Sequence, residues 1–294
     1  MNLLFWYQHL PLHISPIAFA VNSFSIRWYA ISYIVSFLVI YGVLFWRINS
    51  ETEKVYQIFN VQFSNPNKIK NPKSEIQNFA IDFLLVTFFA ALLGGRIGYV
   101  LFYNLSYYVS NPLAIISPYD QATGSFVGLY GMSYHGALVA ILIASAIFLK
   151  KRKVDFFAWA DFIIPAVAAG YFFGRIGNFL NGELYGRVTT SPWGMYFASN
   201  PQNLRYPSQL LEAFFEGILL FVILWLIRNK NLARGSLLAI YFIGYGVFRI
   251  LVEQFREPDS QIGFIVANIT LGQVLSISMV LAGFAILVSK RCKK

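Results

Sequence analysis

Residues 156–187 read FFAWADFIIPAVAAGYFFGRIGNFLNGELYGR, an apolar run that ends in a polar, glycine-rich segment. The apolar part, 156–174, has the length of a helix that crosses a bilayer core, which takes about 20 residues. The polar part, 174–187, holds two arginines, one glutamate, two asparagines and four glycines. Glycine lets a backbone approach a bound group closely, and the arginine guanidinium forks onto phosphate. The stretch therefore predicts a membrane-spanning helix with an anion site at its end, most simply a lipid headgroup site.

The rest of the chain repeats the apolar pattern. It is 57% hydrophobic and 12% charged over 294 residues, and its mean hydropathy of +0.57 is too high for an ordinary soluble domain. Both features predict an all-α, polytopic integral membrane protein with about seven transmembrane helices. The expected spans are 28–46, 79–103, 127–149, 156–174, 209–227, 236–253 and 269–289.

The basic residues predict an N-out, C-in orientation, because positive charge is retained on the cytoplasmic side. With an external N-terminus, sixteen of the 23 Lys and Arg residues fall in internal segments and only five in external ones. The internal residues are Arg47, Lys54, Lys68, Lys70, Lys73, Lys150, Lys151, Arg152, Lys153, Arg228, Lys230, Arg234, Lys290, Arg291, Lys293 and Lys294. The external ones, all arginine, are Arg27, Arg175, Arg187, Arg205 and Arg256. The net charge of +10 thus reflects topology and anionic lipids, and we expect no nucleic-acid partner.

We expect one transmembrane domain over residues 1–294. Within it, 1–27 form an external N-terminal segment without the basic start and apolar core of a cleavable signal peptide. Residues 48–78, rich in Asn, Lys and Pro, form a cytoplasmic loop, and 175–208 form an external loop.

Cofactor chemistry has little support in the sequence. The single cysteine, Cys292, permits no intramolecular disulfide and no cysteine-based zinc site, and three scattered histidines lack metal-ligand spacing. Phosphate-loop and serine-elbow motifs are absent. We therefore expect no metal and no cofactor.

Charged groups inside expected spans are candidate functional groups, because they are costly there. Tyr245, Arg249 and Glu253 follow one another at helical spacing and share a face, as a site or as a structural ion pair. Arg96, with Tyr99 one turn on, is either a ligand for an anion or an arginine that snorkels to the interface.

Four further residues have two interpretations each. His135, in the expected third span, is a packing residue or a titratable group for a thiol or water nucleophile. Asp161, and Glu212 or Glu216, are relay carboxylates or pair neighbouring helices.

Several segments together resemble the bacterial prolipoprotein diacylglyceryl transferases, the Lgt family. The family signature is similar to GRIGNFLNGELYGR at 174–187 almost residue for residue. Supporting matches, in the family's order, are RWYAISY at 27–33, LGGRIGYVLFYN at 93–104, MSYHGALV at 132–139, PSQLLE at 207–212 and GYGVFRILVEQFREPD at 244–259. One departure is Tyr206, where the family often has a histidine.

The resemblance implies an enzyme of the bacterial cytoplasmic (inner) membrane with its active site toward the external, periplasmic side. It would transfer the diacylglyceryl group of phosphatidylglycerol to the lipobox cysteine of a prolipoprotein signal peptide, forming a thioether and releasing glycerol phosphate. This is the first step of lipoprotein maturation. Its partners would be phosphatidylglycerol, the signal peptide and membrane lipids, and we expect a monomer.

The resemblance and the candidates above together predict the site. The expected catalytic residues are Arg175, Arg249, His135, Glu253 and Tyr29. The expected phosphatidylglycerol ligands are Arg175, Asn178, Glu183, Gly186, Arg249, Tyr99, Arg96 and Tyr245. We expect Arg175 and Arg249 to clamp the phosphate, which gains negative charge as it leaves. The thiol, whose pKa is ordinarily about 8.5, would be activated either by His135 or by the clustered arginines.

Two other classes remain open on the sequence. A secondary transporter would need a midplane ion site and commonly inverted repeats, for which an odd number of spans gives little support. A non-catalytic lipid-binding or assembly protein would bind phosphatidylglycerol without turnover.

Overall fold

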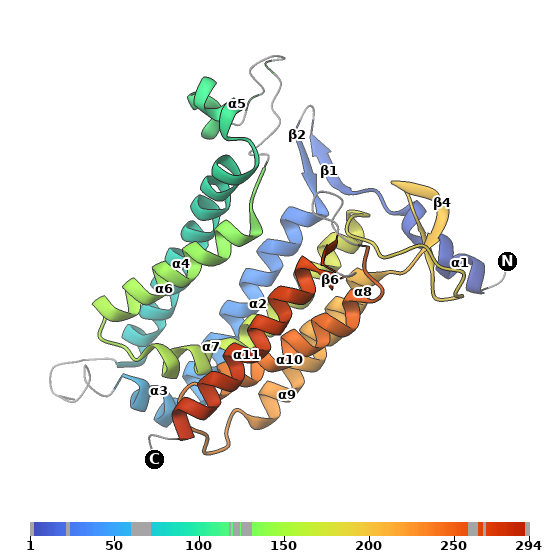
Figure 1. Ribbon diagram of the computed structural model, residues 1–294. Helices are drawn as coiled ribbons and strands as arrows, with labels where there is room; N and C mark the ends of the chain where they lie inside the picture. Colours follow the sequence, from blue (N-terminus) through green and yellow to red (C-terminus); the bar gives the residue numbers. More distant parts are fainter. Residues whose placement is uncertain are drawn as a thin grey trace. The chain divides into compact units, whose positions relative to one another are not determined.

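The computed structural model describes residues 3–21, 24–59, 72–117, 119, 124, 131–257, 264–266 and 269–291 (Figure 1). Seven of its helices are long and apolar enough to cross a membrane, namely Trp28–Ser50, Pro72–Tyr103, Tyr134–Lys151, Phe156–Leu180, Ser208–Ile227, Ser236–Glu253 and Leu271–Ser289. In the described residues the strands form two-stranded antiparallel hairpins. The predicted all-α architecture with about seven spans is confirmed.

Some helix boundaries differ from the expected ones. Helix α7 (Phe156–Leu180) continues beyond 174, so the first six residues of the expected external loop 175–208 are helical. Helix α6 (Tyr134–Lys151) begins seven residues later than the expected 127, because Ser133 accepts the Gly136 N–H as its N-cap. The expected cytoplasmic loop 48–78 contains α3 (Thr52–Ile58) and the start of α4 (Pro72–Tyr103). Its residues 60–71 lie outside the described part of the chain.

By its contacts the chain divides into two compact units, residues 1–43 with 157–294 and residues 44–156. The first unit contains most of α2 (Trp28–Ser50), together with α7, α10 (Ser236–Glu253) and α11 (Leu271–Arg291). It also contains one continuous helix made of α8 (Ser208–Glu212), the π-helical turn η3 (Ala213–Leu219) and α9 (Leu220–Ile227). A single transmembrane domain over the whole chain stays a prediction.

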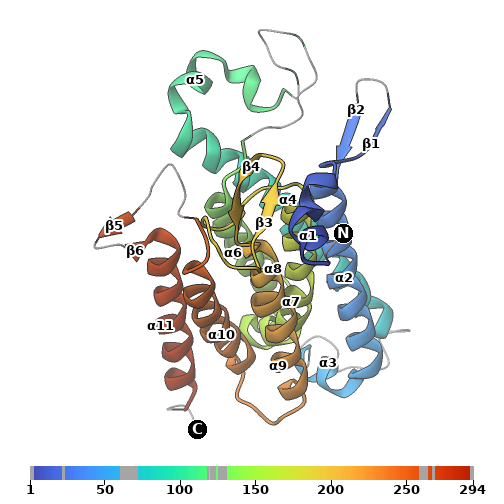
Figure 2. The same cartoon turned by 90° about the vertical axis from the view of Figure 1, so that its right-hand side faces the viewer.

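Glycines set the spacing of the helices in the first unit. A Cβ atom on Gly246 of α10 would lie 2.6 Å from the Ser276 carbonyl oxygen, and one on Gly283 of α11 would lie 2.7 Å from that of Ala239. The two helices, which run antiparallel, are seen side by side in Figure 2. Small residues permit such close packing in lipid, where no hydrophobic force draws helices together.

Asp161 of α7 joins two helices of the first unit. Its carboxylate accepts the backbone N–H of Gly235 at 2.6 Å and that of Leu238 at 2.9 Å. These groups lie at the N-terminus of α10, where unpaired N–H groups favour an anion. Of the two interpretations of Asp161, the structure supports helix pairing.

The N-terminal segment covers one end of α7. It comprises α1 (Leu3–His9), the 3₁₀ turn η1 (Leu10–His13) and the hairpin β1 (Ile17–Val21)–β2 (Phe24–Arg27). Tyr7 and Leu10 pack against a buried cluster of Phe179, Met195 and Phe197. The last two residues lie at the ends of β3 (Met195–Phe197), which pairs with β4 (Asn200–Arg205), and a third hairpin joins β5 (Phe264–Val266) to β6 (Ile269–Thr270).

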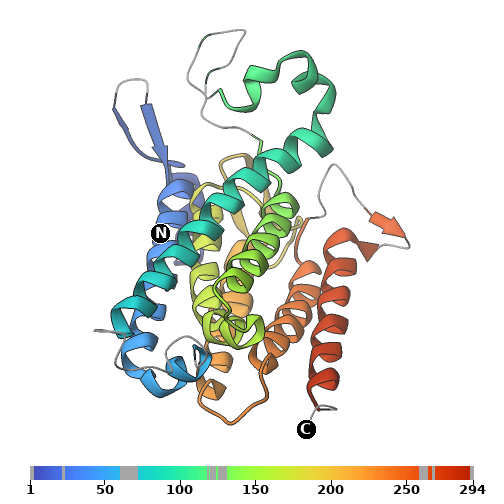
Figure 3. The same cartoon turned by 90° about the vertical axis from the view of Figure 1, so that its left-hand side faces the viewer.

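The second unit contains α3, α4, α5 (Leu105–Ser110), the 3₁₀ turn η2 (Pro112–Ile115) and α6. Helices α4 and α6 pack side by side, as Figure 3 shows. A Cβ atom on Gly136 of α6 would lie 2.3 Å from the Gly94 carbonyl oxygen of α4. Gly98 and Gly136 also face each other, since a Cβ atom on Gly98 would lie 2.8 Å from the Gly136 Cα.

Candidate active site

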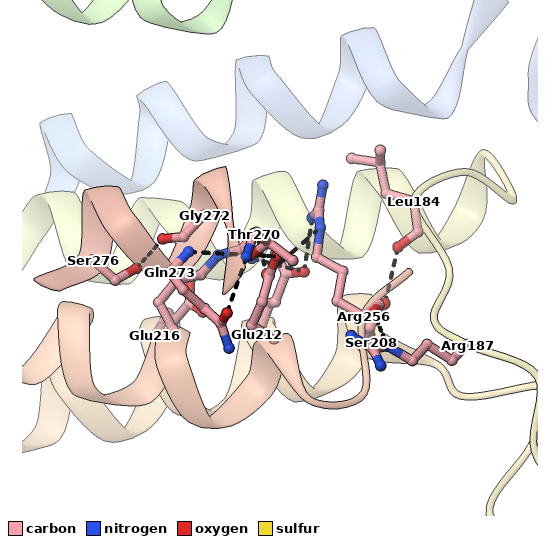
Figure 4. Close-up of polar contacts among 12 residues, drawn as sticks. Leu184, Arg187, Ser208, Glu212, Glu216, Arg256, Thr270, Gly272, Gln273 and Ser276 are labelled. Atoms are coloured by element: carbon pink, nitrogen blue, oxygen red, sulfur yellow. Dashed lines mark hydrogen bonds and ion pairs between the residues drawn. The ribbon is translucent and has the colours of Figure 1, made fainter. Parts of the chain in front are cut away.

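Glu212, the last residue of α8, is the centre of a buried group of charges in the first unit. Its side chain is 0% exposed, and three arginines contact it. The Nε atom of Arg175 lies 2.8 Å from Oε2, and the Nη1 atoms of Arg249 and Arg256 each lie 3.1 Å from Oε1. Figure 4 shows Glu212 and Arg256 among these contacts. We call these four residues, with Glu253 and Glu216, the arginine cluster.

Glu253 is the second carboxylate of the arginine cluster. Its Oε2 atom lies 3.0 Å from Nη2 of Arg249, the ion pair that their spacing on one helix predicted. Arg256 approaches the same oxygen at 4.0 Å, and the Thr270 hydroxyl donates to Oε1 at 2.7 Å. Because a Cβ atom on Gly272 would lie 2.9 Å from this carboxylate, only glycine leaves it this room at the start of α11.

Glu216, one turn after Glu212, is the third carboxylate and is also fully buried. The Tyr171 hydroxyl donates to its Oε2 atom at 2.5 Å and accepts Nε–H of Arg175 at 2.7 Å. The hydroxyl of Tyr245 lies 3.5 Å from that of Tyr171. The π-helical turn η3 begins directly after Glu212 and includes Glu216, and such turns often occur at functional sites.

Burial decides which members of the cluster can meet a ligand. The Arg175 side chain is 18% exposed and that of Arg249 is 11% exposed, whereas Glu212 is fully covered. An incoming anion therefore meets guanidinium groups before it meets a carboxylate. Because charges away from water interact strongly, the cluster is suited to hold and stabilise a phosphate.

The signature segment orients Arg175. The amide oxygen of Asn178 accepts Nη1–H of Arg175 at 3.3 Å, and its amide nitrogen donates to Oε1 of Glu183 at 2.8 Å. After α7 the chain turns through Gly182 and Leu184, which have φ values of +65° and +58°. These contacts place Asn178 against Arg175 and Glu183 against Asn178, and the expected contact of both residues with lipid stays a prediction.

Gly186 lies where three backbone segments meet. Its N–H donates to the Tyr206 carbonyl oxygen at 2.7 Å, and a Cβ atom would lie 2.2 Å from the Phe255 carbonyl oxygen. Arg187 adds a further bond to this junction, since its N–H donates to the same Phe255 oxygen at 2.9 Å. Gly186 thus joins the signature loop to the segment that carries Arg256, and its expected contact with lipid stays a prediction.

Tyr29 lies at the start of α2, where its hydroxyl donates to that of Tyr33 at 2.9 Å. A Cβ atom on Gly177 would lie 3.6 Å from the Tyr29 Cα atom. Tyr29 therefore lies opposite the last turns of α7, next to Gly177, which follows Arg175 by two residues in sequence.

Arg96, Tyr99 and His135 belong to the second unit. Arg96 donates to the carbonyl oxygens of Ile115 at 2.8 Å, Ala114 at 2.7 Å and Gly131 at 3.2 Å, so it secures the segment after α4. Tyr99 stacks on Tyr103 and lies against Gly131.

His135 lies within the candidate membrane span Tyr134–Lys151, as predicted, but at the N-terminal end of its helix. Helix α6 begins at Tyr134, so His135 is exposed in its first turn and contacts the ring of Tyr134. The late start of α6 has a local reason, because Ser133 caps the helix and Gly131, two residues before the cap, has a φ of +80°.

Four residues of the site were not predicted as such: Tyr171, Glu212, Glu216 and Arg256. Each lies three or four residues from a predicted site residue or from another member of the set, and this helical spacing was the available signal. Glu212 and Glu216 had been considered only as relay or pairing residues. Among the described residues, no group of three His, Cys, Asp or Glu side chains could hold a metal ion.

Comparison with known proteins decides the family. The model of the prolipoprotein diacylglyceryl transferase family matches residues 16–289. The chain belongs to this family. A phosphatidylglycerol–prolipoprotein diacylglyceryl transferase of Chlorobaculum tepidum is 46% identical over 286 residues, covering 96% of this chain and 92% of that protein. Proteins of the same name from Desulfotalea psychrophila and Rickettsia bellii are each 41% identical, covering 95% and 96% of this chain and 94% and 97% of their own lengths.

Within the prolipoprotein diacylglyceryl transferase family, this chain is a multi-pass membrane protein by its seven apolar helices. The stretch GRIGNFLNGELYGR contributes Arg175, Asn178, Glu183 and Gly186 to the site. Of the other members of the arginine cluster, Glu212 comes from PSQLLE and Arg249, Glu253 and Arg256 come from GYGVFRILVEQFREPD.

Replacement of Glu212 by alanine is expected to destabilise the protein strongly. It leaves three arginines without their shared carboxylate, and breaking a buried ion pair costs about 3–5 kcal/mol. Thermal unfolding in detergent measures the effect. Glu257→Ala is the matched control, because Glu257 also pairs with an arginine, Arg205, but is 47% exposed. Its loss should cost about 1 kcal/mol or less, and equal destabilisation by both variants would contradict the central role of Glu212.

Proposed function

We propose that this chain transfers the diacylglyceryl group of phosphatidylglycerol to the thiol of a lipobox cysteine in prolipoproteins, as the first step of lipoprotein maturation. Family membership supports the proposal, as do the names of relatives that are 41–46% identical over nearly the whole chain. The observation that carries it is the arginine cluster, a partly accessible set of cations at the end of membrane-spanning helices.

The proposed reaction is a displacement at a glyceryl carbon. A carbon–sulfur bond forms, the carbon–oxygen bond to phosphate breaks, and the electron pair of that bond leaves with glycerol phosphate. The thiol proton is released. No carbonyl is attacked, so the main demand on the protein is to stabilise the negative charge that develops on the leaving phosphate.

Arg175 and Arg249 are the proposed phosphate clamp. They project from α7 and α10 onto the same carboxylate, so their guanidinium groups lie close to one another across Glu212. Arg256 is the third cation of the cluster. Asn178 orients Arg175 by accepting a hydrogen bond from its Nη1 atom. Tyr245, Glu253 and Tyr29 are proposed to support the clamp, whereas Arg96 and Tyr99 would contribute through the second unit.

Arg175→Ala or Arg249→Ala is expected to lower kcat/KM at least about 100-fold, since each removes a cation from the charge that develops in the transition state. Purified protein with phosphatidylglycerol and a lipobox peptide provides the assay, with released glycerol phosphate as the readout. Arg152→Ala is the control, because Arg152 pairs with Asp82 at an exposed site.

Near-normal transfer by either clamp variant would contradict this assignment. Binding of phosphatidylglycerol without turnover by the wild-type protein would instead support the lipid-binding module, and movement of an intact solute across vesicles would support a transporter.

We further propose that the chain lies in the bacterial inner membrane as N-out, C-in, with the arginine cluster toward the external side. The distribution of basic residues supports this orientation. Since all members of the cluster come from one chain, we propose the monomer as the active unit.

The orientation is testable with the chain's only cysteine. We expect Cys292 in intact spheroplasts to resist a membrane-impermeant thiol reagent and to react after permeabilisation. The matched variant C292S/A198C places the thiol in the exposed β3–β4 turn, where it should react without permeabilisation. The opposite pattern of labelling would reverse the topology.

The thiol is activated either by His135 or by the nearby arginines, and a pH profile separates the two. If His135 is the base, His135→Gln should remove an ionisation from the pH dependence of kcat/KM as well as lower it. A profile that keeps its shape and falls only in height would mean that His135 is structural and that the arginines stabilise the thiolate.

A further inference from the structure

The carboxylates of the arginine cluster differ in how they contact the arginines. Three guanidinium groups face three carboxylates among the described residues, but only Glu212 and Glu253 contact arginines directly. Glu216 reaches Arg175 only through the hydroxyl of Tyr171, which accepts from the arginine and donates to the carboxylate. Glu216 is thus a third carboxylate that is separated from the clamp residue Arg175 by one side chain, that of Tyr171.

Glu216 differs from Glu212 and Glu253 in that no arginine among the described residues forms an ion pair with it. It is fully buried, and its Oε1 atom has no hydrogen-bond partner among the described residues. A buried carboxylate that served only to pack helices would be expected to have both oxygens paired, because an unpaired one costs free energy. These features indicate a role in which the charge of the Glu216 carboxylate itself matters.

The proposed reaction changes the charge of the bound phosphate. Phosphatidylglycerol is a phosphodiester with one negative charge, whereas glycerol phosphate is a monoester that carries about −1.5 to −2 at pH 7. Coulomb energy scales with the charge of the ligand, so each surplus positive charge in the site favours the product over the substrate. A clamp with an uncompensated third arginine would be slow to release its product.

We propose that Glu216 is a specificity-determining residue, whose carboxylate offsets the third arginine and keeps the site from holding the dianionic product more tightly than the monoanionic lipid. The inference rests on the proposed function. It assigns Glu216 no contact with the reacting atoms, and it gives Tyr171 the separate role of positioning Nε of Arg175.

The test compares KM for phosphatidylglycerol with the inhibition constant of glycerol phosphate in the wild type and in Glu216→Gln. Glutamine keeps the shape and an acceptor oxygen for Tyr171, but it removes the charge. We expect the inhibition constant to fall about tenfold and KM only about threefold, because the added attraction doubles for a doubly charged ligand. The control Glu75→Gln removes a carboxylate from the exposed first turn of α4 and should change neither constant.

A ratio of the two constants that is unchanged in Glu216→Gln would overturn the inference. Tyr171→Phe separates charge from position, because it keeps the carboxylate and removes only the bridge to Arg175. We expect it to lower kcat and leave the ratio near the wild-type value. If it shifted the ratio as Glu216→Gln does, the effect would come from the position of Arg175, and the inference would fail.

A measurement on the wild-type protein covers the case in which Glu216→Gln does not fold. Glycerol phosphate and its methyl diester, used as inhibitors, differ mainly by one charge. A balanced cluster should bind them with affinities within about threefold, and a preference above about tenfold for the monoester would overturn the inference. Absence of transfer by the wild-type protein would instead overturn the proposed function.

Discussion

One buried carboxylate, Glu212, holds together the functional end of the first unit. Three arginines from α7, α10 and the turn after α10 share its two oxygens. Without it, the three arginines would lose the carboxylate that they share in the protein interior, where removing one partner of an ion pair costs several kcal/mol. The ion pairs therefore fix the relative positions of α7, α8 and α10, and the same contacts hold the clamp arginines in place for an anion.

The membrane environment explains both the packing and the charges. Lipid draws apolar helices together weakly, so their association depends on close contact between small residues such as Gly246 and Gly283. The same low-dielectric surroundings strengthen every ion pair in the arginine cluster and raise the cost of leaving one incomplete. An enzyme of this kind can thus be both stabilised and equipped for catalysis by one set of charges.

Much of the site could be predicted because helical spacing is regular. Arg249 and Glu253 are four residues apart on one helix, and their ion pair follows from that spacing alone. Arg175 and Asn178 lie three residues apart on α7, and their hydrogen bond also follows from helical spacing. The role of Glu212 could not be predicted, since nothing local to α8 shows that arginines from α7, α10 and the turn after α10 converge there. The start of α6 was predicted too early, because a cap at Ser133, rather than apolar composition, decides where the helix begins.

The sequence by itself determined the seven spans, the concentration of basic residues in alternate loops, and the signature that assigns the family. These features depend on composition and on spacing within one segment, and both can be read directly along the chain. Only the tertiary structure decided that Glu212 is the shared partner of three arginines, that Glu216 accepts a hydrogen bond from Tyr171, and that Gly186 joins two loops. Those relations depend on how helices far apart in sequence are oriented toward one another, and that orientation is set by side-chain packing.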